Sequence, residues 1–181
     1  MTDPLAETRP ALAAPRYPAF VPTFLTVPQR PLLAIGGAWL LTILGSLMLA
    51  AIVRAVYPQG GTPDFANLQG RGAGEILFWL VVFAPVLETL IMGGILLILL
   101  HFMRPGYAVV VSAAGWAIAH SMQETAWGMV IWWPFLIFSL LFVVWRERSL
   151  LLAFLMPMTV HAMQNFLPAL TVAFPETFGG M

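Results

Sequence analysis

The chain has 181 residues, of which 60% are hydrophobic and only 9% are charged, and its formal net charge at pH 7 is zero. This composition provides too little polar surface for a soluble globule and predicts an integral membrane protein. All basic residues are arginines, balanced by an equal number of acids, so no basic surface indicates nucleic-acid binding. The lack of cysteine excludes a disulfide framework, a thiolate metal site and a cysteine nucleophile.

Residues 1–31 are rich in proline and carry scattered charges. Seven prolines fall within them, at positions 4, 10, 15, 18, 22, 28 and 31. Because proline lacks a backbone N–H, this spacing cannot propagate a long helix. We therefore predict a Pro-rich N-terminal arm that is mobile or lies on the surface. It lacks the continuous apolar region and cleavage site of a signal peptide, so the first apolar stretch is expected to be retained.

Five apolar stretches follow, and each predicts a helix in the membrane. The first, residues 32–56, is long enough to cross about 30 Å of hydrocarbon. After a Gly-rich and Pro-rich connection, the others cover residues 75–103, 107–122 (short for a full crossing), 126–145 and 150–167. The sequence thus predicts an all-α, polytopic integral membrane protein with about five transmembrane helices. The first helix covers residues 32–56, a helical membrane core covers 75–168, and a C-terminal tail covers 169–181.

Arginine placement predicts the orientation of these helices, since short loops rich in arginine stay cytoplasmic. With a cytoplasmic N-terminus, six arginines fall on the cytoplasmic side, at positions 9, 16, 30, 104, 146 and 148. Only Arg54 and Arg71 fall on the other side. We therefore expect the N-terminus to be cytoplasmic and the C-terminus to lie on the opposite side.

Glu88 lies in the middle of the apolar stretch from Ile76 to Leu100. An ionisable group at such a depth costs roughly 2.5–3.5 kcal/mol on insertion scales, and it indicates a functional site with a polar partner. The plain alternative is a buried glutamate that is protonated or hydrogen-bonded between helices. Pro85, three residues earlier, is expected to kink this helix and to free backbone carbonyls beside the carboxylate.

Three more polar residues are expected at the depth of Glu88, namely His120, His161 and Asn165. Counting about 1.5 Å per residue from the cytoplasmic helix ends places all four at roughly 17–22 Å. His161 and Asn165 are four residues apart, so they share one helix face. The sequence therefore predicts a polar intramembrane site formed by three helices.

These side chains favour a carboxylate that activates water. The sequence contains no H-E-x-x-H and no G-x-S-x-G motif, and both of its aspartates fall outside the predicted helices. What remains is a glutamate base, with imidazoles and an amide that position the water and stabilise an oxyanion. Glu88, His120 and His161 also make a His₂Glu set that can bind Zn²⁺ and leave a position for water, so a metal mechanism is open.

With these residues the chain resembles the CPBP (Abi) family of intramembrane peptidases, which includes CAAX proteases and bacteriocin-processing enzymes. The family pattern is E-E-x-x-x-R, then F-x-x-x-H, then H-x-x-x-N on successive helices. The corresponding segments here are Glu88 to Gly93, Trp116 to His120, and His161 to Asn165. They occur in the family order and at the family spacing.

The first motif departs from the family pattern at two positions. Thr89 stands where the family has a second glutamate, and Gly93 stands where it has an arginine. In the family these two residues are thought to pair, so their joint loss is consistent with removal of a supporting bridge. We expect Thr89→Glu alone to destabilise the protein, because it buries a second carboxylate without a cation. Addition of Gly93→Arg is expected to make that change better tolerated.

The resemblance implies a glutamate-dependent intramembrane endopeptidase of the bacterial inner membrane, which acts on a membrane-associated or prenylated-type peptide or protein. It implies that Glu88 and His120 activate water while His161 and Asn165 hold the oxyanion, without a cofactor or with Zn²⁺. Two other function classes are open. One is a catalytically silent relative that serves as a binding, assembly or immunity factor for a membrane protein. The other is a transport or accessory subunit that uses the same residues as a proton path. The sequence predicts neither the substrate, nor a protein partner, nor the oligomeric state.

Overall fold

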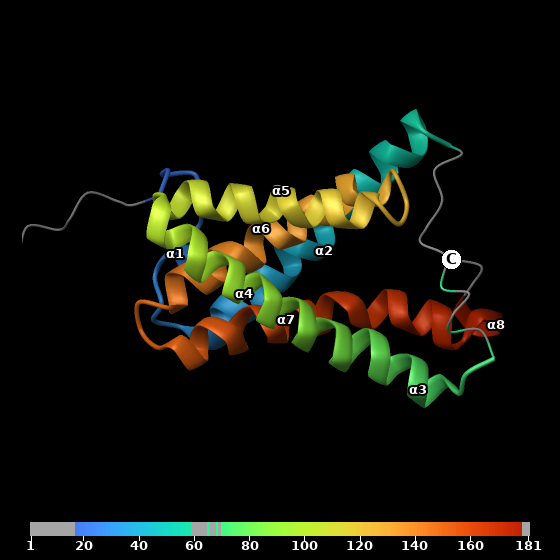
Figure 1. Cartoon of the computed structure of the whole chain (residues 1–181). Helices are drawn as coiled ribbons and strands as arrows, with labels where there is room; N and C mark the ends of the chain where they lie inside the picture. Colours follow the sequence, from blue (N-terminus) through green and yellow to red (C-terminus); the bar gives the residue numbers. More distant parts are fainter. Residues whose placement is uncertain (1–16, 59–64, 66–67, 69, 179–181) are drawn as a thin grey trace, which may run out of the picture.

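The computed structural model describes residues 17–58, 65, 68 and 70–178, and every regular element within these residues is a helix (Figure 1). In chain order these are α1 (Thr23–Thr26), α2 (Pro31–Val56), α3 (Ala73–Leu77), the π-helix η2 (Phe78–Phe83), α4 (Ala84–Phe102), α5 (Pro105–Ser121), α6 (Trp127–Trp145), α7 (Leu150–Ala173) and α8 (Pro175–Phe178). Proline begins both α2 and α5, where the N–H that it lacks has no partner within the helix.

Four helical segments are long enough and apolar enough to cross a membrane: Pro31–Val56, Ala73–Phe102, Trp127–Trp145 and Leu150–Ala173. The second of them joins α3, η2 and α4 into one rod of 30 residues. The fold is therefore all-α and polytopic, with about four such helices where the sequence predicts five. The remaining predicted segment does form a helix, α5, but its 17 residues extend only about 25 Å at 1.5 Å per residue. That length falls short of a hydrocarbon layer of about 30 Å.

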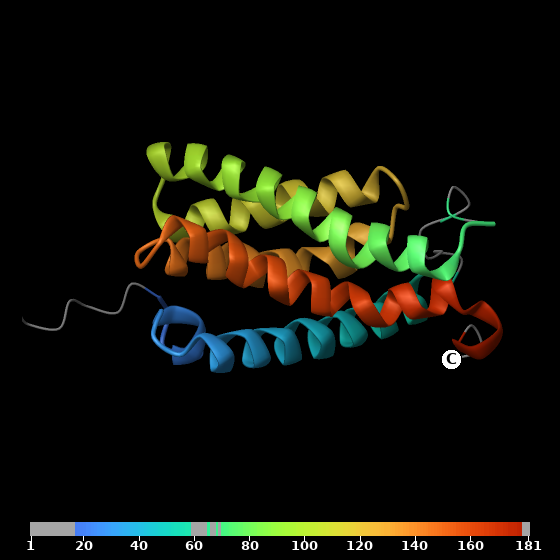
Figure 2. The same ribbon diagram turned by 90° about the horizontal axis from the view of Figure 1, so that it is seen from below.

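The long helices lie side by side, and successive ones run in opposite directions (Figures 1 and 2). α6 is the most enclosed, because it packs against α2, α5 and α7 at once. Its large side chains, including Phe135, Phe138, Phe142 and Trp145, form the centre of the hydrophobic core. The outer face of α2 instead exposes leucines at positions 40, 44 and 47, which suits a surface that faces lipid.

Two specific contacts fix α6 against its neighbours. The indole nitrogen of Trp133 donates a hydrogen bond of 2.7 Å to the backbone oxygen of Leu41 on α2. Gly45 makes this approach feasible, because a β-carbon there would lie 2.6 Å from Cε2 of Trp133. On the α5 side, Ser139 donates a buried hydrogen bond of 3.0 Å to Ser112. Contacts outside the site thus fix α6 against α2 and against α5, the helix that carries His120.

Both ends of the described chain are more ordered than the composition suggests. Residues 1–16 of the predicted arm lie outside the described residues, but residues 17–30 pack on the bundle. Leu25 of α1 is buried in the core, and Arg148 donates a hydrogen bond of 3.3 Å to the backbone oxygen of Pro28. At the other end, α7 continues through Pro168 to Ala173, where the sequence predicts a tail. A proline removes its own backbone hydrogen bond and crowds the carbonyl four residues back, and membrane helices tolerate both because neighbouring groups satisfy the freed carbonyl.

The expected kink at Pro85 takes the form of a change in hydrogen-bond register. The six residues before α4 form the π-helix η2, and the amide of Ala84 donates to the backbone oxygen of Trp79, five residues back. In an α-helix the ring of Pro85 would clash with the carbonyl four residues back, and the wider π register relieves that clash. This segment directly precedes the turns of α4 that carry Glu88.

Candidate active site

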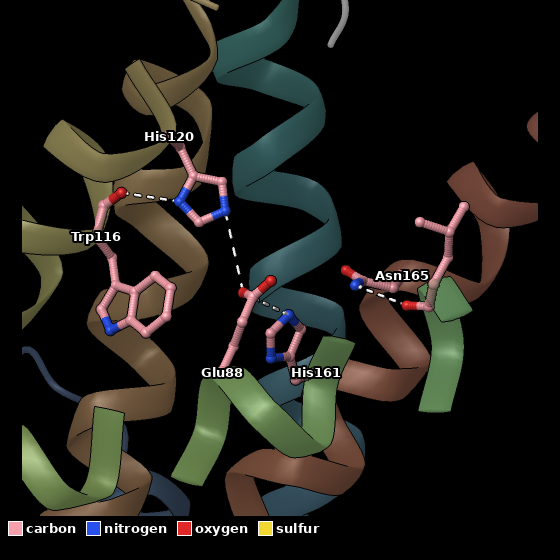
Figure 3. Close-up of polar contacts among 6 residues, drawn as sticks. Glu88, Trp116, His120, His161 and Asn165 are labelled. Carbon is pink, nitrogen blue, oxygen red and sulfur yellow. Dashed lines mark hydrogen bonds and ion pairs between the residues drawn. The ribbon is translucent and has the colours of Figure 1, made fainter. Parts of the chain in front are cut away.

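Glu88, His120 and His161 come together from three helices, α4, α5 and α7 (Figure 3). Oε2 of Glu88 lies 3.7 Å from Nε2 of His161 and 4.0 Å from Nε2 of His120. The convergence predicted from matched helix depths is therefore confirmed for these three side chains.

The two histidines are enclosed by aromatic rings. Only 8% of the His120 side chain and 5% of the His161 side chain are exposed, compared with 25% for Glu88. His161 stacks on Phe138 with ring centroids 4.8 Å apart, and His120 meets the edge of Trp127 at 4.7 Å. Phe135 contacts both imidazoles, at 5.5 and 5.4 Å. Glu88 is therefore the member of the cluster that an incoming molecule can reach most readily.

The surroundings of Nδ1 indicate different tautomers for His120 and His161. Nδ1 of His120 lies 2.8 Å from the backbone oxygen of Trp116, an acceptor, so Nδ1 carries the proton. In the neutral ring, Nε2 of His120 then presents a lone pair to Glu88. Nδ1 of His161 is buried and has no hydrogen-bond partner among the described residues. A proton there would be an unsatisfied buried donor, so His161 carries its proton on Nε2 and points it at the carboxylate.

The separations among these atoms suit a small bridging molecule. Distances of 3.7 and 4.0 Å are longer than direct hydrogen bonds, which end near 3.2 Å for nitrogen and oxygen. Polar groups at this spacing are typically joined through water. Both Glu88 and Nε2 of His120 accept hydrogen bonds, so one water molecule can donate one hydrogen bond to each. This is the geometry of a water held by a general base.

Asn165 belongs to the same face of α7 as His161, but its amide is directed elsewhere. Its Nδ2 donates a hydrogen bond of 3.0 Å to the backbone oxygen of Leu80 in η2, as Figure 3 shows. Asn165 is thus close to the site, and one of its two amide protons is already bonded. The role of oxyanion donor that the sequence suggests stays a prediction.

The donor set does not fit a metal centre. Two ligands bound at 2.0–2.1 Å to one tetrahedral Zn²⁺ lie about 3.3 Å apart. The carboxylate oxygen of Glu88 is farther than this from both imidazole nitrogens. Among residues 17–58, 65, 68 and 70–178, no group of three or more His, Cys, Asp or Glu side chains is arranged to hold a metal ion. The geometry therefore favours chemistry by the side chains themselves.

Thr89 and Gly93, the two positions that depart from the E-E-x-x-x-R pattern, are surrounded by apolar packing. Thr89 is buried, and its hydroxyl has no hydrogen-bond partner in the described part of the chain. A β-carbon on Gly93 would lie 2.6 Å from Cε2 of Phe142 and closer still to Cε1 of Phe154. An arginine at position 93 would therefore collide with these two rings. This packing argues against the expectation that Gly93→Arg would make Thr89→Glu better tolerated.

Several aromatic residues that surround the site are not among the polar residues that the sequence pattern identifies. Phe135 and Phe138 enclose the histidines, and Trp127 contacts His120. The ring of Trp116, which stands at the phenylalanine position of the family pattern, stacks on Phe135 with centroids 4.5 Å apart. The sequence alone does not single out the aromatic side chains of α6, because apolar residues are expected in any membrane helix.

No family model, no curated protein and no solved structure matches this chain. Function must therefore be inferred from the site itself.

Proposed function

We propose that this protein is a glutamate-dependent intramembrane endopeptidase of the CPBP type. The observation that carries the proposal is the position of Oε2 of Glu88 between Nε2 of His120 and Nε2 of His161, at 4.0 and 3.7 Å. The order and spacing of the three motif segments support it further, since Glu88, His120 and His161 all match the family pattern and also meet in space.

In the proposed reaction, Glu88 and His120 hold one water molecule next to the carbonyl carbon of the scissile peptide bond. Glu88 takes one proton of this water as the water oxygen attacks the carbonyl carbon. Nε2 of His120 accepts a hydrogen bond from the other O–H and so orients the water. The N–H on Nε2 of His161 donates to the carboxylate or to the developing oxyanion. When the C–N bond breaks, the proton held by Glu88 passes to the leaving nitrogen.

The substrate is proposed to be a membrane-associated or prenylated-type peptide or protein. The site lies between long apolar helices, and Glu88 is its most exposed member. A chain that reaches this carboxylate must itself enter the bilayer, which favours a substrate with an apolar anchor or a lipid group. A peptide bond in a regular helix is shielded by its own hydrogen bonds, so the cleaved segment is expected to be locally extended.

The proposed location is the bacterial inner membrane, with the N-terminus in the cytoplasm and the C-terminus outside. The start of α2, the α4–α5 turn and the α6–α7 turn lie together at the left end of the bundle in Figure 1. The sequence places Arg30, Arg104, Arg146 and Arg148 in these segments, and Arg54 and Arg71 near the other end of the same helices. This distribution favours a cytoplasmic left end.

The test is a comparison of membranes from cells that express the wild type or Glu88→Gln. This change is nearly isosteric and removes the ability to take a proton from water. New peptide N-termini are identified by labelling free α-amino groups, and peptides that span each new terminus then serve as substrates for the purified protein in liposomes. We expect Glu88→Gln to insert normally and to lower kcat by about 100-fold or more.

The matched control is Glu75→Gln, because Glu75 pairs with Arg71 outside the site. This variant should give the same new N-termini as the wild type. If the wild type and Glu88→Gln produce identical N-termini while Glu88→Gln still supports the cellular phenotype, the protein acts as a binding partner. The peptidase proposal would then be rejected in favour of the catalytically silent relative.

A further inference from the structure

The backbone of η2 contains one carbonyl whose expected donor is missing. In this π-helical register each amide donates to the carbonyl five residues back, and the amide of Ala84 donates to the oxygen of Trp79. The next donor in the register would be the amide of residue 85, and its acceptor would be the oxygen of Leu80. Residue 85 is proline, which has no N–H. A backbone acceptor in a membrane bundle then needs a donor from another element.

Asn165 supplies that donor. Its Nδ2 lies 3.0 Å from the oxygen of Leu80, the carbonyl that Pro85 cannot reach, and it comes from α7, 85 positions along the chain. The chain between these two residues includes α5 and α6, so no local rule of helix capping creates this contact. Asn165 lies one turn after His161, so one face of α7 contacts both the carboxylate of Glu88 and the backbone of η2.

We infer that Asn165 is a positioning residue that replaces the backbone hydrogen bond lost at Pro85 and thereby holds Glu88 in place. One residue added to a helical turn rotates everything beyond it by about 100° relative to the part before. The π register therefore decides which face of α4 carries Glu88 toward the histidines. Its catalytic consequence rests on the proposed function, whereas the hydrogen-bond coupling between Asn165 and Pro85 does not.

The coupling is tested by a double-mutant cycle on thermal unfolding of the purified full chain in detergent. Asn165→Leu removes the donor at nearly constant volume, and we expect it to lower the unfolding midpoint by about 2–4 °C, the effect of one hydrogen bond in a chain of this size. Pro85→Ala restores a backbone N–H at residue 85. In the Pro85→Ala background, Asn165→Leu should lower the midpoint by less than half as much.

The matched control is the neighbouring residue Gln164, whose side chain donates a hydrogen bond of 3.2 Å to Ser46 on α2. Gln164→Leu should cost the same in both backgrounds, because its partner does not involve Pro85. If Asn165→Leu also costs the same in both backgrounds, the inference is overturned, whether or not the protein cleaves peptides.

A second measurement keeps the test independent of the Pro85 variant. Backbone amide exchange in deuterated buffer reports local opening. Asn165→Leu should accelerate exchange of the amides of residues 78–84 by about fivefold, the factor expected for loss of roughly 1 kcal/mol, while α5 keeps its protection. Gln164→Leu should leave residues 78–84 unchanged. Equal exchange in the wild type and in Asn165→Leu would also overturn the inference.

Kinetics separate this role from that of an oxyanion donor. A positioning residue is dispensable once the missing N–H is restored, so the kcat lost in Asn165→Leu should recover about tenfold when Pro85→Ala is added, with little change in KM. A direct oxyanion donor would cost the same kcat in both backgrounds. That result would reject the positioning role even if Glu88→Gln abolishes cleavage and the peptidase proposal holds.

Discussion

Nε2 of His161 lies 3.7 Å from Oε2 of Glu88, while the other ring nitrogen of His161 is buried and has no partner in the described residues. His120 approaches the same carboxylate oxygen with its Nδ1 bonded to a backbone carbonyl. The two imidazoles therefore differ in what they present to Glu88. His161 presents an N–H donor, and His120 presents a lone pair.

This difference predicts unequal effects of the same substitution. A glutamine side chain can place an amide N–H near the position of Nε2, but it offers no basic nitrogen. His161→Gln should keep the donor and lower kcat by about tenfold or less. His120→Gln offers only a weakly basic amide oxygen in place of the Nε2 lone pair, so it should hold the attacking water less well and lower kcat by more than His161→Gln does. The measurement is cleavage of the same liposome-bound peptide by both variants. Equal losses, or a larger loss in His161→Gln, would contradict the tautomer assignment.

The packing around Gly93 predicts a stability effect that its neighbour does not share. Gly93→Ala would push a methyl group into Phe142 and Phe154, and overpacking of this kind costs about 1–3 kcal/mol. A methyl group added at Gly94 would have no other atom within 4 Å, so Gly94→Ala is the matched control and should be neutral or slightly stabilising. Thermal unfolding in detergent measures both.

The same packing predicts the outcome of restoring the family pair. Thr89→Glu buries a carboxylate where even the threonine hydroxyl has no partner in the described chain. Adding Gly93→Arg should lower the unfolding midpoint further, because the arginine stem meets the two phenylalanines before it reaches the carboxylate. A double variant more stable than Thr89→Glu would show that the core rearranges to accept the pair.

Removal of metal ions should leave the activity unchanged. The proposed reaction uses Glu88, His120 and His161 without an ion, and the distances from the carboxylate to both imidazoles exceed those of shared zinc ligands. We expect full cleavage after dialysis against a strong chelator, with no further gain on addition of Zn²⁺. If the chelator instead abolishes cleavage and Zn²⁺ restores it, the three side chains close around an ion and the metal-free mechanism is wrong.

Single cysteines can map the orientation, because the natural sequence has none. Gly106→Cys lies in the first turn of α5 and Gly72→Cys lies directly before α3, and a β-carbon at either position meets no other atom within 4 Å. A charged maleimide that cannot cross membranes should label Gly106→Cys only from the cytoplasmic side and Gly72→Cys only from the other. Gln123→Cys, in the α5–α6 connection, should be labelled together with Gly72→Cys if α5 crosses. If Gln123→Cys is instead labelled from the same side as Gly106→Cys, α5 does not cross the membrane.

Hydrophobicity and helix geometry were sufficient to predict much of the molecule. Each predicted helix forms, and Glu88, His120 and His161 meet because equal rise per residue places them at equal depth. Counting depth along a helix tolerates errors of several residues at the boundaries, so the convergence could be predicted even though the helix ends could not.

Features set by hydrogen-bond register and by side-chain packing could not be predicted in this way. Pro85 indicates a disturbance in the helix, but composition does not distinguish a kink from the π-helix that forms. Asn165 has the depth and spacing of a site residue, and only the three-dimensional arrangement reveals its bond to Leu80. In the sequence, Gly93 only indicates that the arginine of the family pattern is missing. In the structure, Phe142 and Phe154 from two other helices occupy the space that a side chain at position 93 would need.

The shortness of α5 has a consequence for how the site obtains water. His120 is the penultimate residue of α5, so the imidazole to which the proposed reaction gives the role of orienting the water lies within one turn of a helix end. A helix about 25 Å long is roughly 5 Å shorter than a typical hydrocarbon layer, and a bilayer thins locally around a helix that is too short to span it. We therefore expect the bilayer to be locally thinned around α5. Each turnover of the proposed hydrolysis would consume one water molecule, and such a dip in the membrane surface would supply it without a channel through the bundle.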